Sequence, residues 1–258
     1  MFLCLLSFAQ SPSDLNDTKF ICKYYVEFLK DTLDIESKTS EVMVLQIGNN
    51  TSLYKSQQKR ATDSLRALSL QKSLEAAKTN GTMVVDFSKI PRVNLVHEVY
   101  KNHNEFVVFD KINKDQFVYP VTEKILWKIG TAKKRIGGYE CTEATGVYNG
   151  RTYIAWFTGE INIAEGPYIF KELPGLVLEL YDSEKYFFIT LISVENVTEK
   201  ILPIKGAIRT DQLTFKNKRK EVAENPVAAY QNISNTPLTK ELKDRIIQRT
   251  RKINNFLD

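Results

Sequence analysis

Two histidines are the first residues to examine for chemistry, because imidazole can serve as a general base or a metal ligand near neutral pH. The chain contains only two, His97 and His103. Residues six apart on one strand share a face but lie ~20 Å apart, so these two could hold a common metal ion only if the chain turned at Asn102. Exposed histidines are the simpler interpretation, and the sequence predicts no metal site.

Carboxylates offer a second route to chemistry, since two carboxyl groups can act as an acid and base pair. Glu160 and Glu165 flank a segment rich in Gly and Pro, and Glu179 and Asp182 follow it. With 31 Asp and Glu in the chain, no pair stands out. The patterns G-x-S-x-G, H-E-x-x-H, the P-loop and Cys-x-x-Cys are missing. The sequence therefore favours a non-enzymatic binding protein with no catalytic residues and no cofactor. The alternative is a hydrolase with scattered carboxylates and one histidine.

The N-terminal residues are typical of an exported protein. Residues 1–9 form an apolar run with small Ser7 and Ala9 placed before a cut at Gln10, which is the pattern of a signal-peptide remnant. A buried N-terminal strand is the alternative. No apolar run approaches the ~20 residues of a membrane-spanning helix, so we expect an exported chain that does not span the membrane.

Export would allow disulfide formation. Once Cys4 is removed with the leader, Cys22 and Cys141 remain as a candidate disulfide. Two buried thiols on separate strands are an equally good interpretation.

Positive charge is concentrated after residue 198. The net charge is +5, and the excess lies in a basic extension, residues 199–258, which ends in an expected helix at Leu238–Leu257 that packs on the domain. Nucleic acid is not an expected partner of an exported protein. A solvated face is the simplest interpretation of these charges, and contact with an acidic lipid or partner is the alternative.

Strands dominate residues 10–198, which we expect to form one β-rich domain. Residues 20–28 alternate between apolar and polar side chains, and short apolar runs separated by turn residues continue to residue 197. Asn149-Gly150 predicts a tight hairpin turn, and Met83–Phe87 is expected to be a strand. One internal helix, Gln57–Thr79, is expected from an apolar stripe of Leu65, Leu68, Leu70, Leu74 and Ala77. The pattern predicts an α+β fold with a mainly antiparallel sheet, sandwich or partly open barrel.

A segment with two bends breaks this run of strands. Gly166-Pro167 makes the first bend, and Pro174-Gly175 predicts a type II turn just before the strand that begins at Leu176. One interpretation is a rigid corner that seals one end of the sheet. The other is a rigid loop that presents a contact surface formed by Tyr168, Phe170 and Leu173.

The run ELPGLV at residues 172–177 resembles the motif that names the GLPGLI family of exported Bacteroidota proteins. Further matching pieces lie between residues 41 and 197, including the 136–144 run and Gly166-Pro167-Tyr168. The chain departs from the motif at Glu172, where the family has Gly, and at Val177, where it has Ile. We therefore expect that the backbone freedom of Gly is not needed at position 172.

The resemblance implies a shape more than an activity, because this family has no established biochemical function. It is similar in pattern to periplasmic lipoprotein carriers, which implies a half-open barrel or strongly curved sheet with one internal helix and a C-terminal helix. It further implies a location in the periplasm or at the outer membrane. The expected partner is a lipid-like apolar ligand or an outer-membrane protein, with an apolar wall that includes Trp127, Trp156 and Phe187.

Overall fold

The computed structural model describes residues 18–80, 93–201, 204, 206–232, 234 and 237–257. Its strands are β1 (Phe20–Leu29), β2 (Lys38–Ile47), β3 (Thr51–Ser56), β4 (Glu98–Asn102), β5 (Glu105–Ile112), β6 (Asp115–Pro120), β7 (Lys128–Ile136), β8 (Tyr139–Tyr148), β9 (Arg151–Thr158), β10 (Leu176–Asp182), β11 (Phe187–Asn196) and β12 (Ile208–Arg209). Its helices are the short 3-10 helix η1 (Ile35–Ser37) and the α-helices α1 (Gln57–Asn80), α2 (Gln212–Glu224), α3 (Pro226–Gln231) and α4 (Lys240–Arg251).

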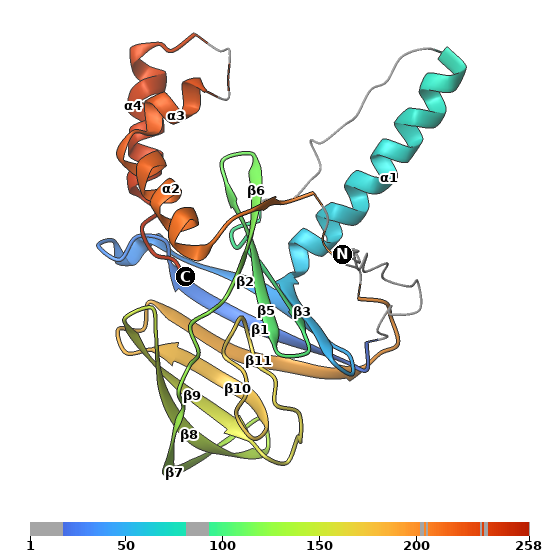
Figure 1. The fold of residues 1–258 in the computed structure, drawn as a ribbon, viewed down its shortest axis with the longest axis vertical. Coiled ribbons are helices and arrows are strands. Elements are labelled where there is room, and N and C mark those ends of the chain that lie inside the picture. The colour runs from blue at the N-terminus through green and yellow to red at the C-terminus, as the bar shows by residue number, and fades with distance from the viewer. Residues whose placement is uncertain are drawn as a thin grey trace, which may run out of the picture.

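All twelve strands belong to one sheet, in the order β12-β6-β5-β4-β3-β2-β1-β11-β10-β9-β8-β7. Among the strands of the described residues, only the short β12–β6 pair is parallel. β1 pairs with β2 on one side and β11 on the other, so it joins the two halves of the sheet. The sheet curves strongly without closing, and α1 and the α2 to α4 group project from the end opposite β7 to β10 (Figure 1). The predicted α+β fold with a curved, mainly antiparallel sheet is confirmed.

The alternation predicted for β1 places one face of this strand in the core. Cys22, Tyr24 and Val26 have no exposed surface, whereas Tyr25 is 38% exposed. The buried Tyr24 hydroxyl donates a hydrogen bond to the Val177 carbonyl (2.9 Å), which satisfies a polar group that would otherwise be costly to bury. The buried face of β1 therefore contacts β10, although β11 lies between these two strands in the sheet.

Helix α1 forms where the sequence predicts a helix, but it does not bury an apolar stripe. Ser56 caps its first turn by accepting a hydrogen bond from the Lys59 N–H (3.1 Å). Successive side chains on an α-helix are rotated by about 100° around its axis. Leu65 and Leu68 therefore lie on a different face of the helix from Leu70 and Leu74. All four leucines are exposed, by 46%, 55%, 46% and 49% of their surface, so the predicted single stripe is wrong.

The C-terminal region contains more helices than the sequence analysis predicts. The expected helix at Leu238–Leu257 is shorter and ends at Arg251, after which the chain returns to the sheet. Helices α2 and α3 were not expected, although Asp211 caps α2 by accepting from the Thr214 N–H (2.8 Å) and Pro226 begins α3. Phe215 on α2 packs on Tyr119 of β6 with ring centroids 4.9 Å apart.

The hairpin between β8 and β9 confirms the predicted turn. Asn149 and Gly150 have φ angles of 53° and 73°, and two successive left-handed residues are typical of a two-residue hairpin.

Two expectations, the signal-peptide remnant at residues 1–9 and the strand Met83–Phe87, lie outside the described residues. Among the helices in the described ranges, none has the length and apolarity needed to cross a membrane.

Candidate functional site

The segment between β9 and β10 is part of the core. Tyr168, Phe170 and Leu173 are each no more than 1% exposed. The Phe170 ring contacts the rings of Tyr153 (4.4 Å between centroids) and Trp127 (6.5 Å). These three side chains therefore form no exposed contact surface, and that interpretation is wrong. The segment is instead buried against Tyr153 and Trp127, and the alternative interpretation, a rigid corner that seals one end of the sheet, stays a prediction.

The two bends of this segment depend on close backbone contacts. An added Cβ at Gly166, next to Pro167, would lie 2.2 Å from the Phe170 carbonyl oxygen, and one at Gly175 would lie 2.0 Å from the Thr158 oxygen. The Gly175 N–H donates to the Leu173 carbonyl (2.7 Å) across Pro174. This bond closes a three-residue turn, so the predicted type II turn is wrong. The following N–H, that of Leu176, donates to the Ile161 carbonyl (3.2 Å) instead of closing the turn.

Position 172 does use the backbone freedom of glycine, contrary to the expectation from the sequence. Glu172 has a φ of 68°, which lies in the left-handed region where a residue other than Gly is strained. The motif glycine of the GLPGLI pattern would relieve this strain, whereas Glu172 retains it.

Replacing Glu172 with glycine is therefore expected to stabilise the chain. The gain should be about 0.5–1 kcal/mol, the strain relieved minus the entropy that glycine adds to the unfolded chain. Chemical denaturation measures it, with the exposed Glu184→Gly as a matched control at a position with ordinary φ. The left-handed assignment fails if Glu172→Gly and Glu184→Gly destabilise the chain equally.

A buried ion cluster anchors the same segment to the sheet. The Lys171 ammonium has no exposed surface and donates to the Glu165 carboxylate (2.5 Å) and to the Ser52 hydroxyl (2.7 Å). The other Glu165 oxygen accepts from Lys101 (2.7 Å). Ser52 lies on β3 and Lys101 on β4, so the cluster joins two strands to the segment before β10.

Charge pairing decides the ionisation of this cluster. Burial alone would raise the pKa of the Glu165 carboxyl, but the ammonium groups of Lys171 and Lys101 outweigh burial and hold that pKa below its ordinary value. Burial lowers the pKa of Lys171, and Glu165 opposes this shift. The cluster thus places an ionised carboxylate at the base of a surface pocket.

That pocket, which we call the amide pocket, has a volume of about 530 Å³ and opens beside the start of β1. It lies where the β2–β3 turn, the β4–β5 turn and the segment before β10 meet, and the His103 N–H ties the two turns together by donating to the Asn50 carbonyl (2.6 Å). Four amide side chains line it: Asn49, Asn50, Asn104 and Asn162. Within the described residues, no hydrogen bond engages these amides. Phe20 and Ile163 supply an apolar side.

The two histidine side chains have different surroundings. His97 on the approach to β4 is nearly buried and contacts the rings of Tyr54 and Tyr168, with centroids 6.2 and 5.0 Å away. His103 is exposed at the β4–β5 turn and lines the amide pocket. Among the described residues, no group of three His, Cys, Asp or Glu side chains is placed to hold a metal ion.

The three predicted wall residues do not form one surface. Trp127 packs on Phe170 and donates its indole N–H to the Lys171 carbonyl (2.9 Å). Trp156 lies beneath the Lys134 ammonium, 4.3 Å from its ring centroid. Only Phe187 lines an apolar pocket, of about 260 Å³, together with His97, Tyr168, Phe28 and the C-terminal residues Phe256 and Leu257.

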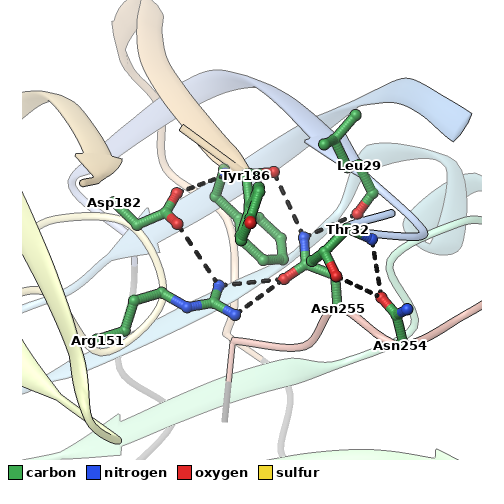
Figure 2. A network of polar contacts seen from close by, with 8 residues as sticks. Leu29, Thr32, Arg151, Asp182, Tyr186, Asn254 and Asn255 are labelled. Carbon is green, nitrogen blue, oxygen red and sulfur yellow. Dashed lines mark hydrogen bonds and ion pairs between the residues drawn. The ribbon is translucent and has the colours of Figure 1, made fainter. Parts of the chain in front are cut away.

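The chain's own C-terminal segment lines this apolar pocket and is held by a network of polar contacts (Figure 2). The side-chain oxygen of Asn255 accepts from both terminal nitrogens of Arg151 (3.1 Å each), and its amide donates to the Leu29 carbonyl (2.8 Å). Arg151 also lies 3.8 Å from the buried Asp182. Burial raises the pKa of the Asp182 carboxyl, although its hydrogen-bond donors and Arg151 oppose this shift.

Removing the Arg151 guanidinium is expected to loosen the C-terminal segment. In Arg151→Met, tryptic cleavage at Arg251 and Lys252 should accelerate about tenfold, because local opening would cost about 1.4 kcal/mol less. Limited proteolysis followed by mass spectrometry measures this, with Arg135→Met at an exposed position near the end of β7 as the control. Equal cleavage rates in the two variants would show that Arg151 does not hold the segment.

Two of the three cysteines lie in the described residues, Cys22 on β1 and Cys141 on β8, and both are free and buried. The structure therefore has two separate thiols and not the candidate disulfide. Burial raises the pKa of the Cys22 thiol to about 12, with Glu165 contributing and Lys171 opposing. Burial also raises the pKa of Cys141.

Cys22 is accordingly expected to resist alkylation in the folded chain. At pH 8 almost none of it is thiolate, the reactive form, so iodoacetamide should label it only as fast as the chain unfolds. Peptide mass spectrometry before and after addition of guanidinium chloride measures this. Native labelling at the rate of a free thiol would contradict the buried position.

The chain belongs to the family described as "N-glycanase peptide, N-terminal domain", which matches residues 87–217. Two solved structures of PNGF-II, in space groups C2 and P21, are similar to it at 18% and 17% identity, with TM-scores of 0.47 and 0.46. Each similarity covers 78% of this chain and 32% of the PNGF-II chain, so the chain spans about a third of that protein's length. No curated protein matches the sequence.

Family membership corrects one expectation. The sequence favours a non-enzymatic protein, but the family takes its description from an N-glycanase, and the expected non-enzymatic class is contradicted. The search for short catalytic patterns could not find this relation, because the match extends over some 130 residues of strands, turns and α2 and contains none of those patterns.

Proposed function

We propose that the chain takes part in the processing of N-linked glycans, as the N-terminal domain of a protein that acts on glycoproteins. The family match over residues 87–217 carries this proposal. The matched range includes β4 to β10 and the segment before β10, and with them Lys101, Asn104, Asn162 and Glu165 of the amide pocket. A polar pocket of this size lies within the range of ~300–1,000 Å³ that is common for ligand sites.

Export to the periplasm or the outer membrane forms part of this proposal. The apolar run at residues 1–9 followed by a polar stretch supports it. A glycan-processing protein in the cell envelope would meet glycoproteins, or fragments of them, before they enter the cell. An outer-membrane protein is the partner that this location favours.

Binding of a glycoprotein before and after removal of its glycans tests the proposed function. The full chain is immobilised, and biolayer interferometry compares a high-mannose glycoprotein with the same protein after enzymatic deglycosylation. We expect binding of the glycosylated form to be at least ~10-fold tighter, a difference of about 1.4 kcal/mol. Equal affinity for the two forms would contradict the proposal, because the polypeptide is the same in both.

Binding of a small apolar ligand is a second candidate function. It is favoured by the apolar pocket of about 260 Å³ between β1, the residues before β4 and the C-terminal segment. Native mass spectrometry of the chain purified from an envelope fraction tests it. A small apolar adduct that is released on denaturation is the expected result, and a bare chain in every preparation would contradict it.

A further inference from the structure

We propose that the amide pocket binds one neutral hexose unit of an oligosaccharide. The inference rests on the proposed function only for the source of that sugar, an N-linked glycan. The recognition itself is argued from the side chains that line the pocket.

The polar side of the pocket matches the hydroxyl edge of a sugar ring. Each Asn side chain offers one acceptor oxygen and two donor hydrogens, and each sugar hydroxyl is both donor and acceptor. A single amide can therefore engage two neighbouring hydroxyls at once. Four such amides, Asn49, Asn50, Asn104 and Asn162, face one cavity, and no hydrogen bond to another described residue occupies them.

The apolar side of the pocket matches the face of a sugar ring that carries only C–H groups. Phe20 and Ile163 are half-buried at the pocket, and Ile47 lies beside them at 4% exposure. Burial of this C–H face against apolar side chains adds a hydrophobic contribution. A ligand with one apolar face and one hydroxyl edge fits the two sides of the cavity together.

The ion cluster beside the pocket leaves hydrogen-bond donors that a sugar hydroxyl can accept. Glu165 is held between Lys171 and Lys101, and both of its oxygens accept hydrogen bonds. The Ser52 hydroxyl also donates to Glu165, so this carboxylate is fully engaged within the protein, and two ammonium groups against one carboxylate leave the cluster with a net positive charge. Lys101 gives one of its three N–H groups to Glu165 and retains donors that a hydroxyl can accept.

An NMR titration of the isotope-labelled chain with methyl α-mannoside and with N-acetylglucosamine tests the inference. We expect saturable shifts in the side-chain amide signals of the four Asn residues, with a Kd near ~1 mM, for at least one of the two sugars. Sodium acetate at the same concentrations should give no saturable shift at these signals. The inference is overturned if neither sugar saturates the signals, or if acetate does so equally well.

Pocket variants locate the binding. The double variant Asn104→Ala/Asn162→Ala should weaken sugar binding about tenfold or more, whereas Asn217→Ala on the exposed face of α2 should leave it unchanged. Because both pocket residues are exposed and make no internal hydrogen bond within the described chain, the double variant should fold normally, which its NMR spectrum checks. Unaltered sugar binding in the double variant would place the site elsewhere and overturn the inference.

The two proposals can fail separately. If the chain distinguishes the glycosylated from the deglycosylated protein but the titration shows no saturable sugar shift, the pocket assignment is wrong and the proposed function stands. If the pocket binds a sugar but deglycosylation does not change glycoprotein binding, the proposed function is wrong and the pocket assignment stands.

Discussion

Replacing Lys171 with methionine is expected to lower the free energy of unfolding by about 3–5 kcal/mol, because it leaves a buried carboxylate without its closest counter-charge. Glu165 would keep Lys101 as its one charged partner, with 18% of the Lys101 side chain exposed, and the hydrogen bond that it accepts from Ser52. The Ser52 hydroxyl would lose its contact with the ammonium as well. Urea denaturation measures the change.

The double variant Lys171→Met/Glu165→Gln separates the charge effect from the loss of packing. It removes both members of the buried pair, and should therefore be more stable than Lys171→Met alone. If Lys171→Met unfolds at the wild-type urea concentration, or if the double variant is no more stable than the single one, the ion cluster does not anchor this segment.

The buried pair of Glu165 and Lys171 also makes the free energy of unfolding depend on pH. The pKa of Glu165 in the folded chain lies below its ordinary value of 4.5, so its contribution is fully present above that value. It is lost as the pH falls through the folded pKa. Glu165→Gln should therefore have a smaller loss of stability below pH 4.5 than the wild type, which thermal denaturation across acidic pH can measure.

Replacing Gly175 with valine is expected to destabilise the chain by about 2–6 kcal/mol, from about 1–3 kcal/mol of backbone strain and about 1–3 kcal/mol of overpacking. Its φ is 148°, and an added Cβ would lie 2.0 Å from the Thr158 oxygen. Both atoms in that contact belong to or adjoin backbone, so a side-chain rotation cannot relieve it.

A matched control separates strain from collision. Gly137 in the β7–β8 turn has a φ of 57°, and an added Cβ there would have no neighbour within 4 Å. Gly137→Val should therefore cost only the strain contribution, about 1–3 kcal/mol. Thermal denaturation of the two variants compares them, and equal losses would mean that the contact with Thr158 does not constrain the corner.

The strands could be predicted because their signals are local. Alternation in β1 and the Asn149-Gly150 turn each depend on a few adjacent residues. The buried position of Phe170 could not be predicted from the sequence, because a large apolar side chain between two bends is equally compatible with an exposed loop and with a buried corner. Its burial follows only from the curvature of the whole sheet, which brings Tyr153 and Trp127 around it.

The candidate site was missed for the same reason. Asn49, Asn104 and Asn162 come from three distant parts of the chain, and each is a common turn residue with no local sign of a shared cavity. Lys171 would be assigned to the surface on residue type alone. Only the pairing of β3 and β4 brings Ser52 and Lys101 to the segment that carries Glu165 and Lys171. In the sequence Glu165 is one of 31 acidic residues, and only its burial in the folded chain distinguishes it.

Hydrogen–deuterium exchange of the full chain with a high-mannose glycopeptide, and with the same peptide after deglycosylation, tests the central claim most directly. The account predicts slower exchange in the segments that form the amide pocket, residues 18–20, 48–51, 101–105 and 162–165, with the glycopeptide alone. Protection that is identical with the two peptides, or that avoids all four segments, would contradict the account.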